Sequence, residues 1–114
     1  MKIIEVTDKH ILFDNGNKIT YDHEQDCCEY NYADFSVINR NNVNYNFDFD
    51  ENLTFKFIEG AGFMFGSKDK NDNMRWIFVP CYSEQNGYYT SHIDIYYETR
   101  ILVTSGNCEE QNYL

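Results

Sequence analysis

Residues 88–97 read Tyr88-Tyr89-Thr90-Ser91-His92-Ile93-Asp94-Ile95-Tyr96-Tyr97. Successive side chains of a β-strand point to opposite faces of the sheet, so every second residue shares a face. One face then carries Tyr89, Ser91, Ile93, Ile95 and Tyr97, and the other carries Tyr88, Thr90, His92, Asp94 and Tyr96. Because the first face holds both isoleucines, we expect it to face the core. The segment predicts a strand with one buried face and one polar face.

Other β-prone runs precede this segment along the chain. They lie at residues 3–6, 11–13, 19–21, 53–59, 63–65 and 74–79. Asn15-Gly16 tolerates positive φ and predicts a tight hairpin over residues 14–17, and Gly60-Ala61-Gly62 predicts a second hairpin. Pro80 has no N–H to donate, so we expect the strand of residues 74–79 to end there and a loop to follow over residues 81–86.

The remaining segments fit around this β framework. Residues 33–39 are compatible with a short helix, and the Asn-rich residues 39–46 read as a surface loop. No change in composition marks a domain boundary. We therefore expect a mainly β fold, a β-rich α+β arrangement in which residues 1–114 form a single antiparallel β domain with one or two short helices. The expected core comprises Phe55, Phe57, Trp76, Phe78, Tyr89, Ile93 and Ile95.

The charge of the chain limits its partners. Nine Lys plus Arg against nineteen Asp plus Glu give a formal net charge of -10. The electrostatic field of this negative charge repels phosphate groups, so we expect no direct nucleic-acid binding and no membrane binding. It is compatible with simple solubility or with attraction to a basic partner surface. No apolar run is long enough to span a membrane, and we expect a soluble, unexported protein.

The heptapeptide His23-Glu24-Gln25-Asp26-Cys27-Cys28-Glu29 is the most unusual motif. Its spacing does not match a closed zinc site, so we expect it to be structural and metal-free. The neighbouring acids raise a thiol pKa, which argues against a nucleophilic cysteine. The four cysteines are expected to be reduced. No spacing singles out a catalytic pair among the carboxylates. We expect no enzymatic activity and no cofactor.

The polar face of residues 88–97 is the candidate binding site. Aromatic rings there can stack on a planar ligand, and His92 and Asp94 can form hydrogen bonds with polar atoms at the edge of that ligand. An ordinary half-exposed sheet face with cross-strand pairs explains the same pattern equally well.

Two motifs carry a resemblance to a known family. The heptapeptide with the following Tyr32-Ala33-Asp34-Phe35 is one, and Val79-Pro80-Cys81-Tyr82-Ser83-Glu84-Gln85-Asn86-Gly87-Tyr88-Tyr89 is the other. Together they resemble a family of small proteins from bacteriophages, prophages and related mobile elements, over residues 15–97. The resemblance extends to phage anti-Thoeris sponges, β-rich oligomers that sequester a cyclic ADP-ribose signal without cleaving it.

This resemblance implies an anti-defence protein in the host bacterial cytoplasm, expected to be a homo-oligomer. The ligand would be a nucleotide-derived immune signal, and the resemblance implies that His92 and Asp94 contact it. The polar face adds Tyr88 and Tyr96, and Arg75 and Arg100 flank the candidate sheet. The expected ligand-binding residues are therefore Arg75, Tyr88, His92, Asp94, Tyr96 and Arg100. The arginines would hold phosphates, a tyrosine would stack on the base, and Asp94 would accept from ribose hydroxyls. Two alternatives stay open. One is an acidic inhibitor of a host defence protein such as a CRISPR nuclease, and the other is a minor metabolic or structural phage protein.

Overall fold

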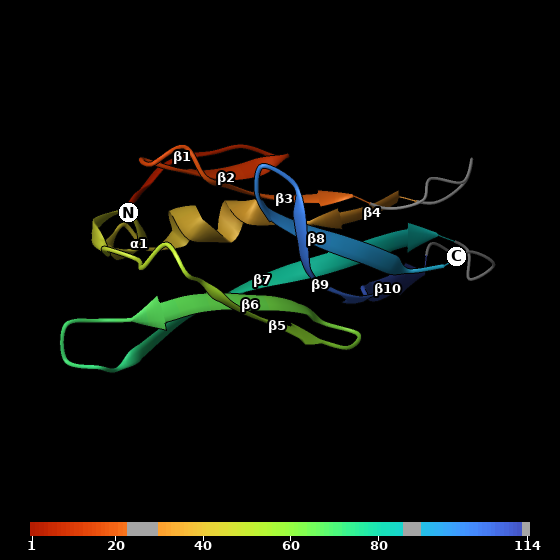
Figure 1. Cartoon of the computed structure of the whole chain (residues 1–114). Helices are drawn as coiled ribbons and strands as arrows, with labels where there is room; N and C mark the ends of the chain where they lie inside the picture. Colours follow the sequence, from red (N-terminus) through yellow and green to blue (C-terminus); the bar gives the residue numbers. More distant parts are fainter. Residues whose placement is uncertain (23–29, 86–89, 113–114) are drawn as a thin grey trace.

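Two β-sheets enclose the core in a computed structural model that describes residues 1–22, 30–85 and 90–112 (Figure 1). The first sheet has the strand order β1-β2-β3-β8-β9. Its strands are β1 (Ile3–Val6), β2 (His10–Phe13), β3 (Lys18–Asp22), β8 (His92–Glu98) and β9 (Ile101–Asn107). The second has the order β10-β7-β6-β5, with β4 also paired to β7. Its strands are β4 (Tyr30–Ala33), β5 (Thr54–Ile58), β6 (Gly62–Lys68), β7 (Met74–Gln85) and β10 (Glu109–Asn112).

The mainly β fold predicted from the sequence is confirmed. Every strand pairing in the described residues is antiparallel except that of β10 with β7, which is parallel. Strands β1, β2 and β3 pair in chain order as an N-terminal meander, and both predicted hairpins are present. In the first hairpin Gly16 adopts φ +91°, and its N–H donates to the Phe13 carbonyl over 3.0 Å. The positive φ explains the glycine at this turn.

The core lies between the inner faces of the sheets. The predicted inner face of β8 is confirmed, since Ile93 and Ile95 are fully buried and Ser91 and Tyr97 are buried beside them. The largest fully buried side chains elsewhere are Ile11, Phe13, Ile19, Phe35, Ile38, Phe49, Phe63, Phe65 and Val79. Phe55 and Phe57 are only half-buried, but they pack against this cluster as expected. Tyr89 lies outside the described residues.

Two predicted core residues of β7 point outward instead. Trp76 and Phe78 are 37% and 41% exposed, whereas Ile77, Val79 and Cys81 are buried. Over residues 76–81 both alternating sets of this strand are apolar, so the pattern alone does not choose the inner face. The prediction for Trp76 and Phe78 was wrong because the smaller, branched side chains fill the space between the sheets.

The predicted end of the strand at Pro80 is also wrong, and residues 81–85 are strand rather than loop. The neighbour of β7 changes at this point from β6 to β4. The Asp34 N–H donates to the Pro80 carbonyl over 2.9 Å, and the Cys81 N–H donates to the Ala61 carbonyl over 3.0 Å. These bonds carry the pairing across the junction, so β7 tolerates the missing N–H of proline.

The Asn-rich stretch is part of the packed structure rather than a simple surface loop. It overlaps a 3-10 helix (Phe35–Arg40) and a one-turn helix, α1 (Val43–Asn46). Asn44 is buried, and its side-chain amide donates to the Ile38 carbonyl over 3.0 Å. Both helices are short, and no helix in the described part of the chain has the length and apolar character to cross a membrane.

Replacing Ile93 with alanine should lower the free energy of unfolding by about 2–4 kcal/mol, because truncating a fully buried side chain leaves a cavity. Urea unfolding followed by circular dichroism measures the change. The control Ile101→Ala, at a side chain that is 52% exposed, should change stability by less than about 0.5 kcal/mol. A loss below about 1 kcal/mol for Ile93→Ala would contradict the packing of this face.

Candidate functional site

Three of the predicted site residues lie on the outer face of β8, as the alternation predicted. His92 is exposed, and Asp94 and Tyr96 are half-buried. The His92 Nε2 and Asp94 Oδ1 atoms are 2.9 Å apart, with the donor set by the histidine tautomer. Across the sheet, Asp94 is opposite Asp22 of β3 and Ser105 of β9. This face is thus a row of hydrogen-bonding side chains with an aromatic ring at its end.

Arg100 joins this face from the turn between β8 and β9. Its guanidinium carbon lies 4.6 Å from the centre of the Tyr96 ring, and its Nη2 atom lies 2.5 Å from the Asp22 carboxylate. Glu98, the last residue of β8, adopts φ +62° where the chain enters this turn. The cation is therefore already engaged by a ring and a carboxylate.

The structure does not bring Arg75 to the same place. Arg75 lies on β7 in the second sheet, where its Nη2 donates to the Asn44 side chain over 2.9 Å. Its guanidinium carbon is 5.3 Å from the centre of the Phe47 ring. Its Nε is buried without a hydrogen-bond partner. Arg75 thus packs against the α1 region, and the remaining predicted residue, Tyr88, lies outside the described residues.

An open hollow of about 490 Å³ adjoins this face where β8 begins. It is lined by Gly60, Thr90, Ser91, Asn107, Cys108, Glu109 and Glu110. Asn107 is the cross-strand neighbour of His92, so the hollow continues the polar row. Two of the described lining residues are carboxylates and none is lysine or arginine. The hollow therefore favours a cationic group over a phosphate.

A third carboxylate holds the wall of this hollow in place. The Glu59 Oε2 atom accepts from the Asn107 backbone N–H over 3.3 Å and from its side-chain amide over 3.1 Å. Glu59 follows β5 and Asn107 ends β9, so this contact joins the two sheets beside the hollow. Glu109 and Glu110 are not predicted as site residues from the sequence, because what distinguishes them is their position in space and not a local motif.

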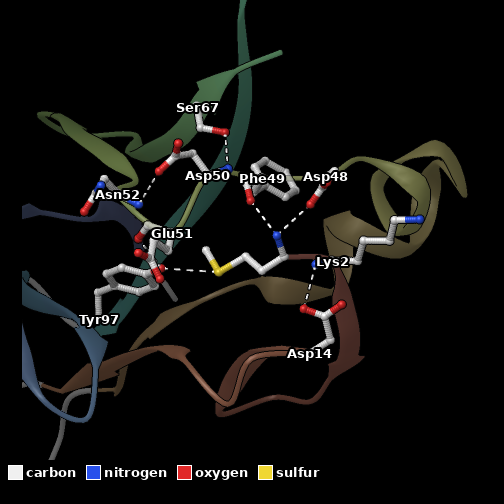
Figure 2. Close-up of polar contacts among 10 residues, drawn as sticks. Lys2, Asp14, Asp48, Phe49, Asp50, Glu51, Asn52, Ser67 and Tyr97 are labelled. Carbon is white, nitrogen blue, oxygen red and sulfur yellow. Dashed lines mark hydrogen bonds and ion pairs between the residues drawn. The ribbon is translucent and has the colours of Figure 1, made fainter. Parts of the chain in front are cut away.

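Three acids follow α1, namely Asp48, Asp50 and Glu51, and Figure 2 shows the polar contacts of this segment. The Met1 ammonium lies 2.6 Å from both the Asp48 carboxylate and the Phe49 carbonyl oxygen. The Asp50 carboxylate accepts from the Asn52 N–H over 2.8 Å. The Glu51 carbonyl accepts from the Tyr97 hydroxyl over 2.7 Å. The Asp48 and Asp50 carboxylates are therefore engaged in contacts within this part of the fold.

Cys81 and Cys108 are buried and carry free thiols. A hydrogen bond with the Cys108 thiol and burial raise the pKa of the Cys81 thiol, which disfavours the nucleophilic thiolate. Within residues 1–22, 30–85 and 90–112, no three or more His, Cys, Asp or Glu side chains are grouped to hold a metal ion. The heptapeptide of residues 23–29 lies outside the described residues.

Comparisons of the chain with known protein families, with curated proteins and with solved structures found no match.

The ion pair between Met1 and Asp48 predicts a pH dependence of stability. A hydrogen bond from the N-terminal ammonium, together with its charge, lowers the pKa of the Asp48 carboxyl. The stabilisation is present above the carboxyl pKa of the unfolded chain, about 3.9, and is lost as the pH falls through the folded-state pKa. Asp48→Asn should therefore be less stable than the wild type at about pH 6, and the difference should shrink by about pH 2.

Urea unfolding at both pH values measures this difference. Asp8→Asn, an exposed acid in the turn between β1 and β2, is the control and should show no such change. A stability difference between wild type and Asp48→Asn that is constant across this pH range would mean that the ion pair does not act in solution.

Proposed function

We propose that this chain is a non-enzymatic binding protein that docks on a basic surface of a partner protein. The observation that carries the proposal is the acidic hollow between the start of β8 and β10. Glu109 and Glu110 line the hollow, and Glu59 accepts a hydrogen bond from the side chain of the lining residue Asn107. The whole chain has a formal net charge of -10. A lysine or arginine side chain of the partner supplies the opposite charge and N–H donors for these carboxylates.

The expected biological setting is that implied by the resemblance to phage proteins. The partner would then be a host defence effector, such as a CRISPR nuclease, whose nucleic-acid groove is lined by lysine and arginine. Opposite potentials on the two surfaces raise the association rate and select against acidic proteins. In this setting the inhibitor occupies a groove that nucleic acid would otherwise enter.

Sequestration of a nucleotide signal is the second candidate, and one arrangement favours it. The Tyr96 ring, the Arg100 guanidinium and the pair of His92 and Asp94 lie along one sheet face. A base can stack there and a ribose can bond to Asp94. We place this candidate second because a pyrophosphate needs free cationic donors. Arg100 is engaged by Asp22 and Tyr96, and Arg75 lies on the other sheet.

The proposed docking predicts that charge reversal in the hollow weakens partner binding. The double variant Glu109→Lys/Glu110→Lys should bind a purified effector nuclease at least about tenfold more weakly than the wild type, because the partner cations then meet like charges. Surface plasmon resonance against a panel of such nucleases measures this. Wild-type binding should also weaken as the salt concentration rises.

The matched control is the charge reversal Asp8→Lys. Asp8 lies between β1 and β2, at the edge of the first sheet opposite to β9. The affinity of this variant should stay close to that of the wild type. Equal affinities for the double variant and the wild type would contradict the proposed use of the hollow.

The sponge candidate makes a different prediction. Heating the protein after incubation with cyclic ADP-ribose isomers should release the ligand intact. Arg100→Ala should weaken that binding by about 1–3 kcal/mol through loss of a charged hydrogen bond. Calorimetry that shows this binding, together with no binding to any nuclease of the panel, would replace the docking proposal with the sponge.

A further inference from the structure

The outward face of β7 forms a long apolar surface that the proposed docking hollow does not use. Alternate residues of the strand point outward, namely Met74, Trp76, Phe78, Pro80, Tyr82 and Glu84, and we call this row the outer strip. Met74, Trp76 and Phe78 are 36%, 37% and 41% exposed. An exposed patch of contiguous apolar side chains marks an interaction surface in a protein with so many charged residues.

Residues of the adjacent strands widen the strip. On β6, Met64 lies opposite Phe78, and Gly66 lies opposite Trp76. A glycine there leaves one side of the indole ring without a covering side chain. On β4, Tyr32 lies opposite Tyr82, with ring centres 5.7 Å apart. The strip is thus aliphatic and aromatic towards Met74 and hydroxyl-rich towards Tyr82.

Side chains of opposite charge flank the two ends of the strip. Lys68 of β6 lies opposite Met74. Its exposed ammonium group lies 3.1 Å from the exposed Asp72 carboxylate, and an ion pair this open to solvent holds the lysine only weakly. Glu84 lies at the other end, opposite Tyr30 of β4. A surface with a cation at one end and an anion at the other end is complementary to itself when one copy is turned end over end.

We propose that the outer strip binds a second copy of this chain, with the two β7 strands antiparallel about a two-fold axis through the middle of the strip. Such an interface is isologous, so each contact occurs twice. With the axis between Phe78 and Pro80, Trp76 of each copy faces Tyr82 of the other. The Lys68 end of each copy then lies over the Glu84 end of the other.

The size of the strip is adequate for this pairing. The strand β7 has 12 residues, which corresponds to a length of about 40 Å. With neighbouring strands about 4.8 Å apart, three strands give a footprint of roughly 600 Å² on each copy. A standard stable interface buries roughly 800 Å² per partner, so the strip and its rim side chains come close to this value.

Self-complementarity is what favours a second copy over an unrelated partner. An unrelated protein needs only an apolar patch to cover Trp76 and Phe78, and nothing would relate the charge near Met74 to the charge near Tyr82. A two-fold dimer uses both ends at once, since the same ion pair forms at both ends of the interface.

Sedimentation equilibrium of the full chain tests the proposal. The wild type should show a mass of twice the single chain at tens of micromolar concentration, and Trp76→Ser should raise the dissociation constant at least about tenfold. Leu102→Ser is the matched control, because this apolar side chain is 55% exposed on the first sheet. It should leave the dimer unchanged. A wild type that stays monomeric up to about 0.5 mM overturns the proposal.

A charge exchange tests the antiparallel arrangement without altering the apolar residues. Lys68→Glu and Glu84→Lys should each weaken the dimer, because each places like charges over one another. The double variant Lys68→Glu/Glu84→Lys should restore the wild-type dissociation constant, since the pair is re-formed with its signs exchanged. Circular dichroism confirms that each variant is folded. The antiparallel pairing is overturned if the loss of dimerisation free energy in the double variant equals the sum of the losses in the two single variants.

Discussion

The alternation of side chains along β7 is the constraint on which most of this structure depends. Its inward residues include Ile77, Val79 and Cys81, which pack between the sheets, and Ser83 and Gln85 are buried further along. Its edges pair with β6, β4 and β10. Because successive side chains of a strand alternate, burial of the inward set forces Trp76 and Phe78 to face outward. The core and the exposed apolar surface therefore have the same origin.

The sequence predicts β8 well and β7 poorly for a clear physical reason. In β8 the isoleucines alternate with His92 and Asp94, so only one face can be buried without burying charge. Over residues 76–81 of β7 both alternating sets are apolar, and the choice of inner face depends on how well each set fills the space beneath the other sheet. Pro80 and Asn44 were misjudged for a related reason. A proline within a strand lacks a hydrogen-bond donor, and a buried asparagine needs hydrogen-bond partners. Asp34 and Ala61 supply the bonds beside Pro80, and Arg75 donates to the Asn44 side chain, although these groups are distant in sequence.

The C-terminal part of the chain shows the same limit. Residues 101–112 form β9 and β10, and β10 pairs in parallel with β7. No local sequence pattern predicts this parallel pairing. Gly106 permits the close approach of β9 to β5, because an added Cβ would lie 2.2 Å from the Phe57 ring. The acidic hollow combines residues 107–110 of this region with Gly60, Thr90 and Ser91 from earlier in the chain. Its residues become neighbours only through the fold, whereas the row of His92, Asp94 and Tyr96 is visible in the sequence.

The central claim is that the hollow, and not the arginine-bearing sheet face, receives the partner's charged group. Amide chemical-shift mapping by nuclear magnetic resonance tests it most directly, with an arginine-rich peptide and a cyclic ADP-ribose isomer titrated separately. We expect the peptide to shift the amide signals of Thr90, Asn107, Glu109 and Glu110, and the nucleotide to leave the spectrum unchanged. Shifts at Tyr96 and Arg100 with the nucleotide, and none in the hollow with the peptide, would contradict it.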